Sequence, residues 1–198
     1  MSLVKISGNA SGTGTLTIAA PNTNSNYTLT LPTNTGTILT NATTTGFPAG
    51  SVLQVVQNTY STTTTISNAT YTDTGLTATI TPTSASSKIL VLSTQLLGYS
   101  ATLFYKFGGY RLLRGSTAIY EPSPLSGGRP YYPGIYLGGS STNDLSFSFF
   151  VTLSYMDSPA TTSSTTYKTQ FDTFDSVGSI NAQAGSRPSV MILMEIAA

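Results

Sequence analysis

The chain of 198 residues contains neither cysteine nor histidine. Without cysteine it cannot form disulfides or thiolate zinc sites, and without histidine it cannot assemble a Ser-His-Asp or Cys-His catalytic group. A glycosidase would need two carboxylates facing a sugar about 5 to 10 Å apart. Asp172 and Asp175 are three residues apart, so on a strand they would point to opposite faces. We therefore expect no enzymatic activity, no metal and no cofactor.

Charged side chains are scarce, at 8% of the chain against roughly 25% in an average soluble domain. A nucleic-acid partner would require clustered Lys and Arg to neutralise phosphates, and the net charge of +1 argues against one. So few charges also weaken the usual defence against association. We expect much of the surface to be concealed in an oligomer or on a particle.

Long apolar segments are missing as well. No window approaches the roughly 18 apolar residues of a membrane span, and the residues after Met1 lack the apolar core of a signal peptide. We expect synthesis in a bacterial cytoplasm followed by assembly, without membrane insertion.

The residues that are abundant favour β structure. Hydrophobic residues make up 39% of the chain and cluster in strand-like runs, which a disordered chain would not show. Ser and Thr are frequent, whereas Glu occurs only at Glu121 and Glu195, so helix formers are few. The composition predicts an ordered, all-β protein.

Residues 12–40 alternate Thr with apolar residues, a period of two that is typical of short strands with one apolar face. Three strands of this size are not stable alone in water. We predict that residues 1–49 form an N-terminal β-strand arm with a linker, which anchors the protein to a larger assembly. The apolar residues assigned to this anchoring role are Leu16, Ile18, Leu29, Leu31, Ile38 and Leu39.

Residues 50–198 contain enough strand-like segments for a separate head domain. The segment 88–98 is the longest apolar run and is expected to lie centrally, and 145–155 alternates as a half-buried antiparallel strand does. Eight or nine strands at this spacing predict an antiparallel β-sandwich, jelly-roll-like in its topology. The expected strands are 52–57, 62–66, 76–81, 88–98, 104–113, 117–120, 145–155, 165–171 and 190–196.

Eight different short sequences follow one another along the chain in a fixed order. They are Gly-Thr-Leu-Thr-Ile at 14–18, Tyr-Thr-Leu-Thr-Leu-Pro at 27–32, Thr-Gly-Thr-Ile-Leu-Thr at 35–40, Gly-Ser-Val-Leu-Gln-Val-Val-Gln at 50–57, Asp-Thr-Gly-Leu-Thr-Ala-Thr-Ile-Thr-Pro at 73–82, Ser-Ser-Lys-Ile-Leu-Val-Leu at 86–92, Asp-Ser-Pro-Ala at 157–160 and Met-Ile-Leu-Met-Glu-Ile at 191–196. In this order the chain resembles tail-fibre and virion-surface proteins of tailed bacteriophages, especially phages of aquatic bacteria. The resemblance spans most of the chain and implies a virion structural protein. It brings no catalytic motif.

Residues 121–144 form the longest irregular stretch, and long loops of this kind are usually functional or disordered. Tyrosines on a loop supply a large contact area at small entropic cost, and they stack on sugar faces. The loop is therefore either a receptor-recognition surface or a contact with a neighbouring subunit. The residues assigned to it are Tyr120, Arg129, Tyr131, Tyr132 and Tyr136.

Basic and aromatic residues are interleaved at 104–114, a pattern that also occurs in nucleic-acid-binding proteins. We favour the alternative of a sandwich strand whose basic residues, Lys106, Arg111 and Arg114, lie on its solvent face.

The sequence thus predicts a bacteriophage virion structural protein, a homotrimer located on the virion with other tail or capsid proteins as partners. The favoured role is a short tail-fibre or tip protein that attaches by its arm and contacts the host surface, with a host glycan as a candidate ligand. The alternative role is a capsid decoration protein that stabilises the head. A glycan-cleaving, tailspike-like enzyme is a remote alternative.

Overall fold

The computed structural model describes residues 11–14, 22–26, 28, 47–101, 109–121, 124–125, 129–130, 145–173 and 179–198. The chain divides into two compact units, Met1–Ile38 and Leu39–Ala198. Every described strand belongs to the second unit. The six apolar residues of the predicted arm lie outside the described residues, so the arm remains a prediction.

The described part of the chain is built from β-strands, with a single 3₁₀ turn, Ala184–Ser186, as its only helical element. The strands are β1 (Val52–Tyr60), β2 (Thr64–Ile66), β3 (Thr72–Ile80), β4 (Lys88–Ala101), β5 (Tyr110–Arg114), β6 (Thr117–Tyr120), β7 (Pro124–Leu125), β8 (Arg129–Pro130), β9 (Leu145–Asp157), β10 (Thr165–Phe171), β11 (Ser179–Ala182) and β12 (Ser189–Ile196).

The eight principal strands pair in a nested order. The first of them, β1, pairs with the last, β12; β3 pairs with β10, β4 with β9, and β5 with β6, all antiparallel. The chain therefore behaves as one long hairpin, with β5 and β6 at its closed end. Rolling such a hairpin into two layers produces a jelly roll.

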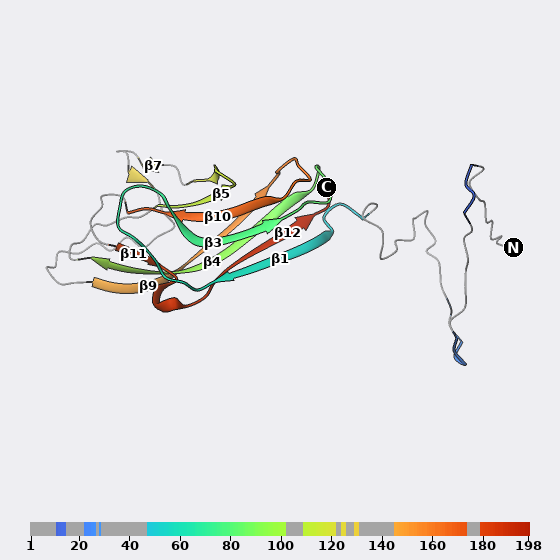
Figure 1. The fold of residues 1–198 in the computed structure, drawn as a ribbon, viewed down its shortest axis with the longest axis horizontal. Helices are drawn as coiled ribbons and strands as arrows, with labels where there is room; N and C mark the ends of the chain where they lie inside the picture. The colour runs from blue at the N-terminus through green and yellow to red at the C-terminus, as the bar shows by residue number, and fades with distance from the viewer. Residues whose placement is uncertain are drawn as a thin grey trace. The chain divides into compact units, whose positions relative to one another are not determined.

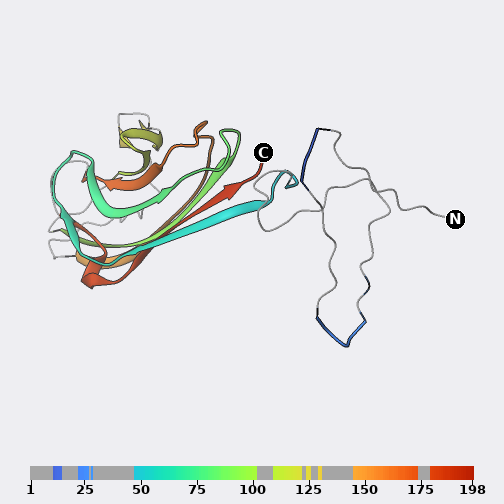
Figure 2. The same cartoon turned by 45° about the vertical axis from the view of Figure 1, so that its right-hand side comes forward.

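Two further pairings close the layers of this jelly roll. In sheet A, β12 also pairs with β4, which gives the order β1-β12-β4-β9, while β11 pairs with the remaining length of the same β4 edge and β2 pairs with β11. In sheet B, β10 also pairs with β5, which gives β3-β10-β5-β6. Figure 1 labels these strands, and Figure 2 shows the two layers curving around the core between them. The predicted antiparallel β-sandwich is confirmed.

The core lies between the sheets and follows from strand alternation. Along β10 the burial alternates residue by residue, so that Tyr167 and Phe171 are buried while Lys168 and Gln170 are only half-buried. Along β4, Ile89, Val91 and Leu97 point inward and are fully buried. Because successive side chains of a strand point to opposite faces, each sheet contributes one inner face to a single apolar cluster.

Polar side chains also join the two sheets through this core. The Thr169 hydroxyl of sheet B donates to Gln95 Oε1 of sheet A at 3.1 Å, and Ser93 Oγ lies 2.8 Å from Tyr110 Oη. All four residues are buried. Such hydrogen bonds satisfy polar groups that would otherwise be costly to remove from water, so they fix how the two sheets are aligned.

A third connection between the sheets is ionic. Asp157, at the end of β9, accepts two hydrogen bonds from Arg114 of β5, at 2.9 and 3.0 Å, and a third from the Tyr167 hydroxyl at 2.6 Å. Asp157 is 6% exposed. Burial, together with the neighbouring carboxylate, raises the pKa of Tyr167 well above its ordinary value, so the phenol remains a donor.

Most expected strands are confirmed, and 117–120 and 165–171 match the structure at both ends. The central position of 88–98 is confirmed, because β4 is hydrogen-bonded along both edges. The expectation that Arg114 lies on a solvent face is wrong, because the residue faces Asp157 across the core. Residues 121–144 were expected to be irregular throughout, yet β7 and β8 pair within them, and β11 was not predicted.

Removing the carboxylate of Asp157 should weaken the connection between the sheets. Asp157→Ala leaves the Arg114 guanidinium and the buried Tyr167 hydroxyl without their acceptor, so we expect the free energy of unfolding to fall by about 3 kcal/mol. Urea denaturation measures this change. In the control, Asp73→Ala breaks the exposed pair with Lys168 and should cost under about 1 kcal/mol. Equal losses in both variants would contradict the role given to Asp157.

A second buried carboxylate, Glu195 of β12, fastens the connection between β3 and β4. Glu195 is fully buried and accepts hydrogen bonds from the amide of Gln54 at 2.6 Å and from the backbone N–H and hydroxyl of Thr83, both at 2.7 Å. Burial opposes ionisation of this carboxyl, but the hydrogen bonds outweigh burial and hold its pKa below the ordinary value.

The lowered pKa of Glu195 predicts a dependence of stability on pH. A carboxyl whose folded pKa lies below its unfolded value of 4.5 contributes stability above that value and loses it as the pH falls further, through the folded pKa. At pH 7 we expect the free energy of unfolding of Glu195→Gln to be about 1 to 2 kcal/mol lower than that of the wild type, because charge-assisted hydrogen bonds are lost. This difference should shrink below pH 4.5 in urea denaturations at several pH values. A constant difference would rule out the ionised carboxylate as its source.

Candidate interaction surfaces

The head has two distinct ends, which we call the base and the apex. At the base the chain joins β1 next to the end of β12, where Gly50 N–H donates to Ala197 O at 2.8 Å and Ala197 N–H donates to Ser51 O at 2.9 Å. At the apex lie the opposite ends of the strands, where Ala101 pairs with Leu145. Figure 1 shows the C-terminus beside the beginning of β1.

The apex is also where segment 122–144 leaves and rejoins the sandwich. Sheet B brings Tyr120, the last residue of β6, to this end beside Leu112, and sheet A begins β9 at the same end with Leu145. Segments 102–108 and 174–178 are likewise bounded by strand ends at the apex. A rigid scaffold that holds the ends of several connecting segments together is a common way to build a binding surface.

Hydrogen bonds hold the strand ends of the apex together. Gly109 and Asp172 exchange backbone hydrogen bonds at 3.0 and 3.2 Å, and Gly109 N–H also donates to the Asp172 carboxylate. Thr173 donates to Asn68 O through both its backbone N–H and its hydroxyl, each at 2.9 Å. A Cβ at Gly109 would lie too close to the side chains of Asp172 and Tyr71, so a larger residue here would force these side chains to shift.

The buried polar groups of the apex have shifted pKa values. Burial raises the pKa of Asp172 above its ordinary value, although its hydrogen bond from Gly109 and the charge of Arg111 oppose the shift. Burial, then the negative charges of Asp172 and Glu121, raise the pKa of Tyr71 to about 12. Tyr71 is therefore a neutral hydrogen-bonding group at physiological pH.

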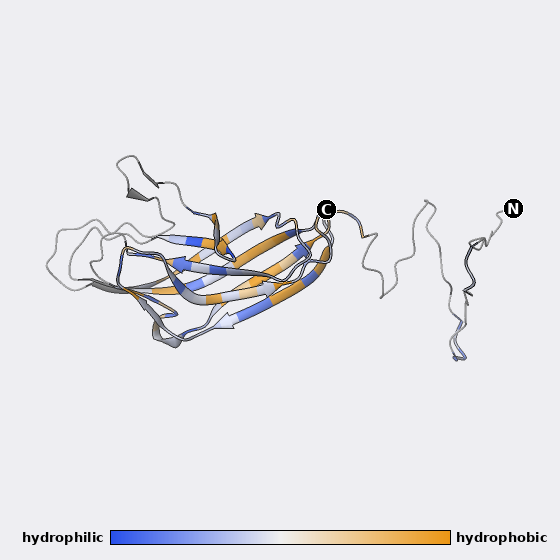
Figure 3. Ribbon diagram, turned by 45° about the horizontal axis from the view of Figure 1, so that its top comes forward, coloured by the Kyte–Doolittle hydropathy of each residue, from blue (hydrophilic) through white to orange (hydrophobic). Residues whose placement is uncertain are grey.

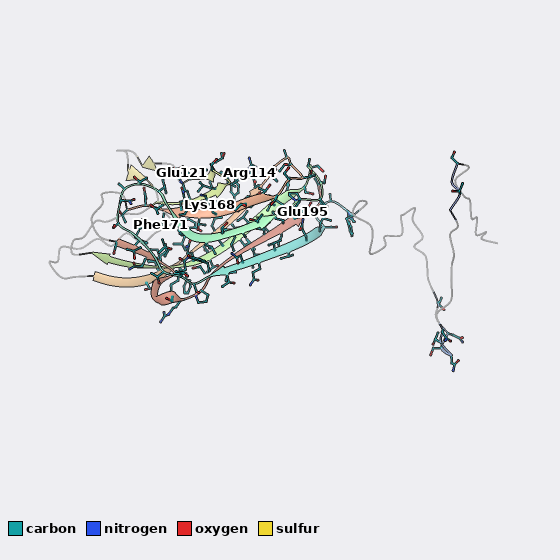
Figure 4. The ribbon with its side chains drawn as sticks, viewed as in Figure 1. Arg114, Glu121, Lys168, Phe171 and Glu195 are labelled. Atoms are coloured by element: carbon teal, nitrogen blue, oxygen red, sulfur yellow. The ribbon has the colours of Figure 1, made fainter. Side chains whose placement is uncertain are left out.

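Arg111 connects the aromatic and acidic groups at the edge of the apex. Its guanidinium carbon lies 3.9 Å from the centroid of the Tyr71 ring, its Nε donates to Gln170 Oε1 at 2.8 Å, and Nη1 lies 3.3 Å from Glu121 Oε2. Figure 4 labels Glu121 and Phe171 toward this end of the head and Glu195 toward the other. The stacking and hydrogen bonds fix the guanidinium in place beside the first residue of segment 121–144.

The polar network continues across the outer face of sheet B. Asp73, Gln170 and Arg111 lie in one cross-strand row on β3, β10 and β5. Gln170 Nε2 and Lys168 Nζ donate to the two oxygens of Asp73 at 2.6 and 2.8 Å. Partial burial opposes ionisation of Asp73, but these hydrogen bonds keep its pKa below the ordinary value. Planar amide, carboxylate and guanidinium groups thus form one row across this face.

Of the residues predicted to form the aromatic loop, the structure places Tyr120 at the end of β6 that is nearer the apex. Its ring is half-buried and its centroid lies 5.9 Å from that of Tyr155 on β9, so one side of Tyr120 packs into the sandwich. Arg129 begins the short strand β8, which pairs with β7. Tyr131, Tyr132 and Tyr136 lie outside the described residues, as do Asp144 and Asp175.

The outer face of sheet A differs sharply from that of sheet B because it is apolar. Of the five large hydrophobic side chains that are exposed among the described residues, four lie on this face: Val52, Val55, Phe150 and Met156, with 53%, 55%, 66% and 46% exposure. Half-buried apolar residues fill the strands between them, namely Leu90, Leu92, Val190, Ile192, Met194 and Ile196. In Figure 3 the strands of the sandwich carry long orange, apolar runs.

The sequence interpretation did not identify this apolar face, although its signal is present. A half-buried antiparallel strand alternates apolar and polar residues, as β10 does, whereas β12 reads SVMILMEI and β4 begins KILVL. Runs of that kind are typical of strands buried on both faces. The apolar run at 88–98 was interpreted only as a sign that this strand lies centrally in its sheet, and not as a sign of an apolar outer face.

Within the described ranges, no group of three or more acidic side chains is placed to hold a metal ion. The same part of the chain contains no helix that is long and apolar enough to cross a membrane.

A scan against protein-family models and a search of curated proteins both found no match. Among solved structures, the chain is similar to a chain in the structure of the infectious bursal disease virus Gt strain. The identity is 12% over 75% of this chain and 39% of that one, and the TM-score is 0.34. The chain is also similar to the VP2 subviral particle of infectious bursal disease virus at 12% identity over 81% and 42%, with a TM-score of 0.35. The chain spans about two fifths of the matched chains, and such low scores support no inference about function.

The environment of Asp172 predicts that its charge is dispensable. Because the folded pKa lies above the unfolded value, the ionised carboxylate reduces stability at neutral pH, and an amide oxygen can still accept the hydrogen bond from Gly109. We expect Asp172→Asn to change the free energy of unfolding by less than about 1 kcal/mol at pH 7 in urea denaturation. A loss of more than about 2 kcal/mol would show that the ionised carboxylate is needed for stability and would contradict this prediction.

Proposed function

We propose that this chain is a structural protein of a tailed-bacteriophage virion, made in the host cytoplasm and assembled as a homotrimer. Its favoured role is a short tail-fibre or tip protein that attaches through residues 1–49 and contacts the host surface with the apex of its head. The resemblance to phage tail-fibre and virion-surface proteins supports the virion assignment. Jelly rolls occur in viral capsid and lectin domains, but a fold alone does not determine function.

The observation that carries the proposed role is that the two ends of the head differ. The chain enters the head at the base, through the hydrogen bonds of Gly50 and Ser51 with Ala197. Both ends of the tyrosine-rich segment 121–144 lie at the apex, beside the fixed Arg111–Tyr71 pair. A protein attached at the base, with Arg111 and a tyrosine-rich segment at the other end, is suited to bind sugars, because tyrosine rings stack on sugar faces and planar groups hydrogen-bond to hydroxyls.

A second candidate role is a capsid decoration protein, and the outer face of sheet A favours it. A broad apolar face with few charges can pack against the shell of a particle as readily as against another subunit. In that role the apex would have no ligand on the host.

Substitutions in the tyrosine-rich segment distinguish the two roles. If the apex binds a host glycan, Arg129→Ala, Tyr131→Ala and Tyr132→Ala should each reduce adsorption of virions to host cells. The loss of about 1 to 3 kcal/mol per contact corresponds to roughly five- to a hundredfold. Matched control variants at the base, Thr162→Ala and Ser164→Ala, should adsorb normally.

The outcome expected of a decoration protein is different. Adsorption would then be unchanged in all five variants, and the segment variants would release DNA from heated virions at a lower temperature than the wild type. That result would replace the tail-fibre role by the decoration role.

A further inference from the structure

The outer face of sheet A forms an ordered apolar surface. The strand registers place Val55, Met194, Leu90 and Met156 in one row across β1, β12, β4 and β9. The next row contains Ile192 and Leu92 between two polar residues at its ends, Gln57 and Ser154. The face is therefore most apolar along its middle strands and along the row nearer the base.

The outer faces of the two sheets differ in how polar their side chains are. On sheet B the outward residues of β10 are Thr166, Lys168 and Gln170, all of which hydrogen-bond to neighbouring side chains. On sheet A the outward residues of β12 are all apolar. Covering such a face is favourable, because about 25 cal/mol is gained for each Å² of apolar surface removed from water.

The size of the apolar face fits an interface between protein subunits. Its four strands are about 4.8 Å apart, and the nine residues from Lys88 to Leu96 rise about 3.4 Å each. The whole outer face, which includes the polar residues Thr59, Thr94 and Thr152 in the row beyond Ile192 and Leu92, thus measures roughly 19 by 30 Å, or about 600 Å² per copy. Two such faces in contact bury about 1,200 Å², which exceeds the roughly 1,000 Å² expected of a specific interface.

The charge of the face favours an identical partner. In the described part of these four strands, Lys88, at the basal border, is the one charged residue that points outward. A partner recognised by charge would require complementary charges here, whereas a neutral face can meet its own copy without repulsion between like charges. Interfaces between identical subunits are also more apolar than other interfaces.

We propose that a second copy of this chain covers the outer face of sheet A, so that this face is the subunit interface of the oligomer. The inference rests on the proposed function in that a virion component assembled from several copies needs such an interface. The partner's own outer face of sheet A supplies the apolar surface that excludes water from Val55, Leu90, Met156 and Met194.

The first test measures the mass of the full-length protein by light scattering at about 10 µM. We expect an even multiple of the 20.7 kDa chain mass, because a face that meets the same face of another copy forms a twofold contact. Val55→Lys and Met156→Lys place a charge in the row and should weaken self-association at least about a hundredfold, which gives monomers at this concentration. Both positions are about half exposed, so the variants should remain folded by circular dichroism. Thr79→Lys, at an exposed position on β3 of sheet B, is the matched control and should keep the wild-type mass.

The second test uses the absence of cysteine from the chain. The single thiol of Ser154→Cys, on the outer face of sheet A, should react with a maleimide at least about tenfold more slowly than that of Thr79→Cys. Dilution to the monomer should remove the protection. Protection that persists in the monomer would show that another part of the same chain covers the face, and would overturn the proposal.

A monomeric wild type, or lysine variants that keep the oligomeric mass, would also overturn it. Because these measurements use purified protein, they are independent of the adsorption assay that tests the proposed function.

Discussion

The structure depends on one constraint, the nested pairing of a single long hairpin. Since β1 pairs with β12, β3 with β10, β4 with β9, and β5 with β6, each strand of the first half has its partner in the second. This pairing alternates strands between two sheets and gathers longer connections at the apex. It also brings the beginning of β1 beside the end of β12 at the base. The division of the head into a base and an apex is thus a property of the topology.

The two sheets serve different purposes within this topology. Both supply an inner face to the core, and the hydrogen bonds of Asp157, Gln95 and Ser93 align them. Outside the core, sheet B carries a hydrogen-bonded polar network around Arg111 and Asp73, whereas sheet A carries an apolar surface. The few charged side chains of the sandwich's outer faces consequently lie mostly on sheet B, and the outer face of sheet A has almost none.

The strands that sequence reasoning located best are those with a clear alternation, such as β10, where Tyr167 and Phe171 alternate with polar residues. The strand β11 was missed because Ser179–Ala182 is short and contains a single large apolar residue, Ile180. The role of Arg114 depends on a carboxylate 43 residues away, and periodicity holds no information about such a partner. The same limit applies to the apex, where Tyr71, Gly109 and Asp172 meet from three separate segments.

The position of β12 between β1 and β4 has a consequence for the order of folding. Synthesis proceeds from the N-terminus, so β1 and β4 exist before the strand that joins them. The hairpin of β5 and β6 has the shortest loop to close and can form first, whereas the outermost pair must close the longest. Until β12 is inserted, neither the central rows of sheet A nor their neutral outer surface exist. The proposed contact between copies through that surface therefore requires that each chain has first completed its fold.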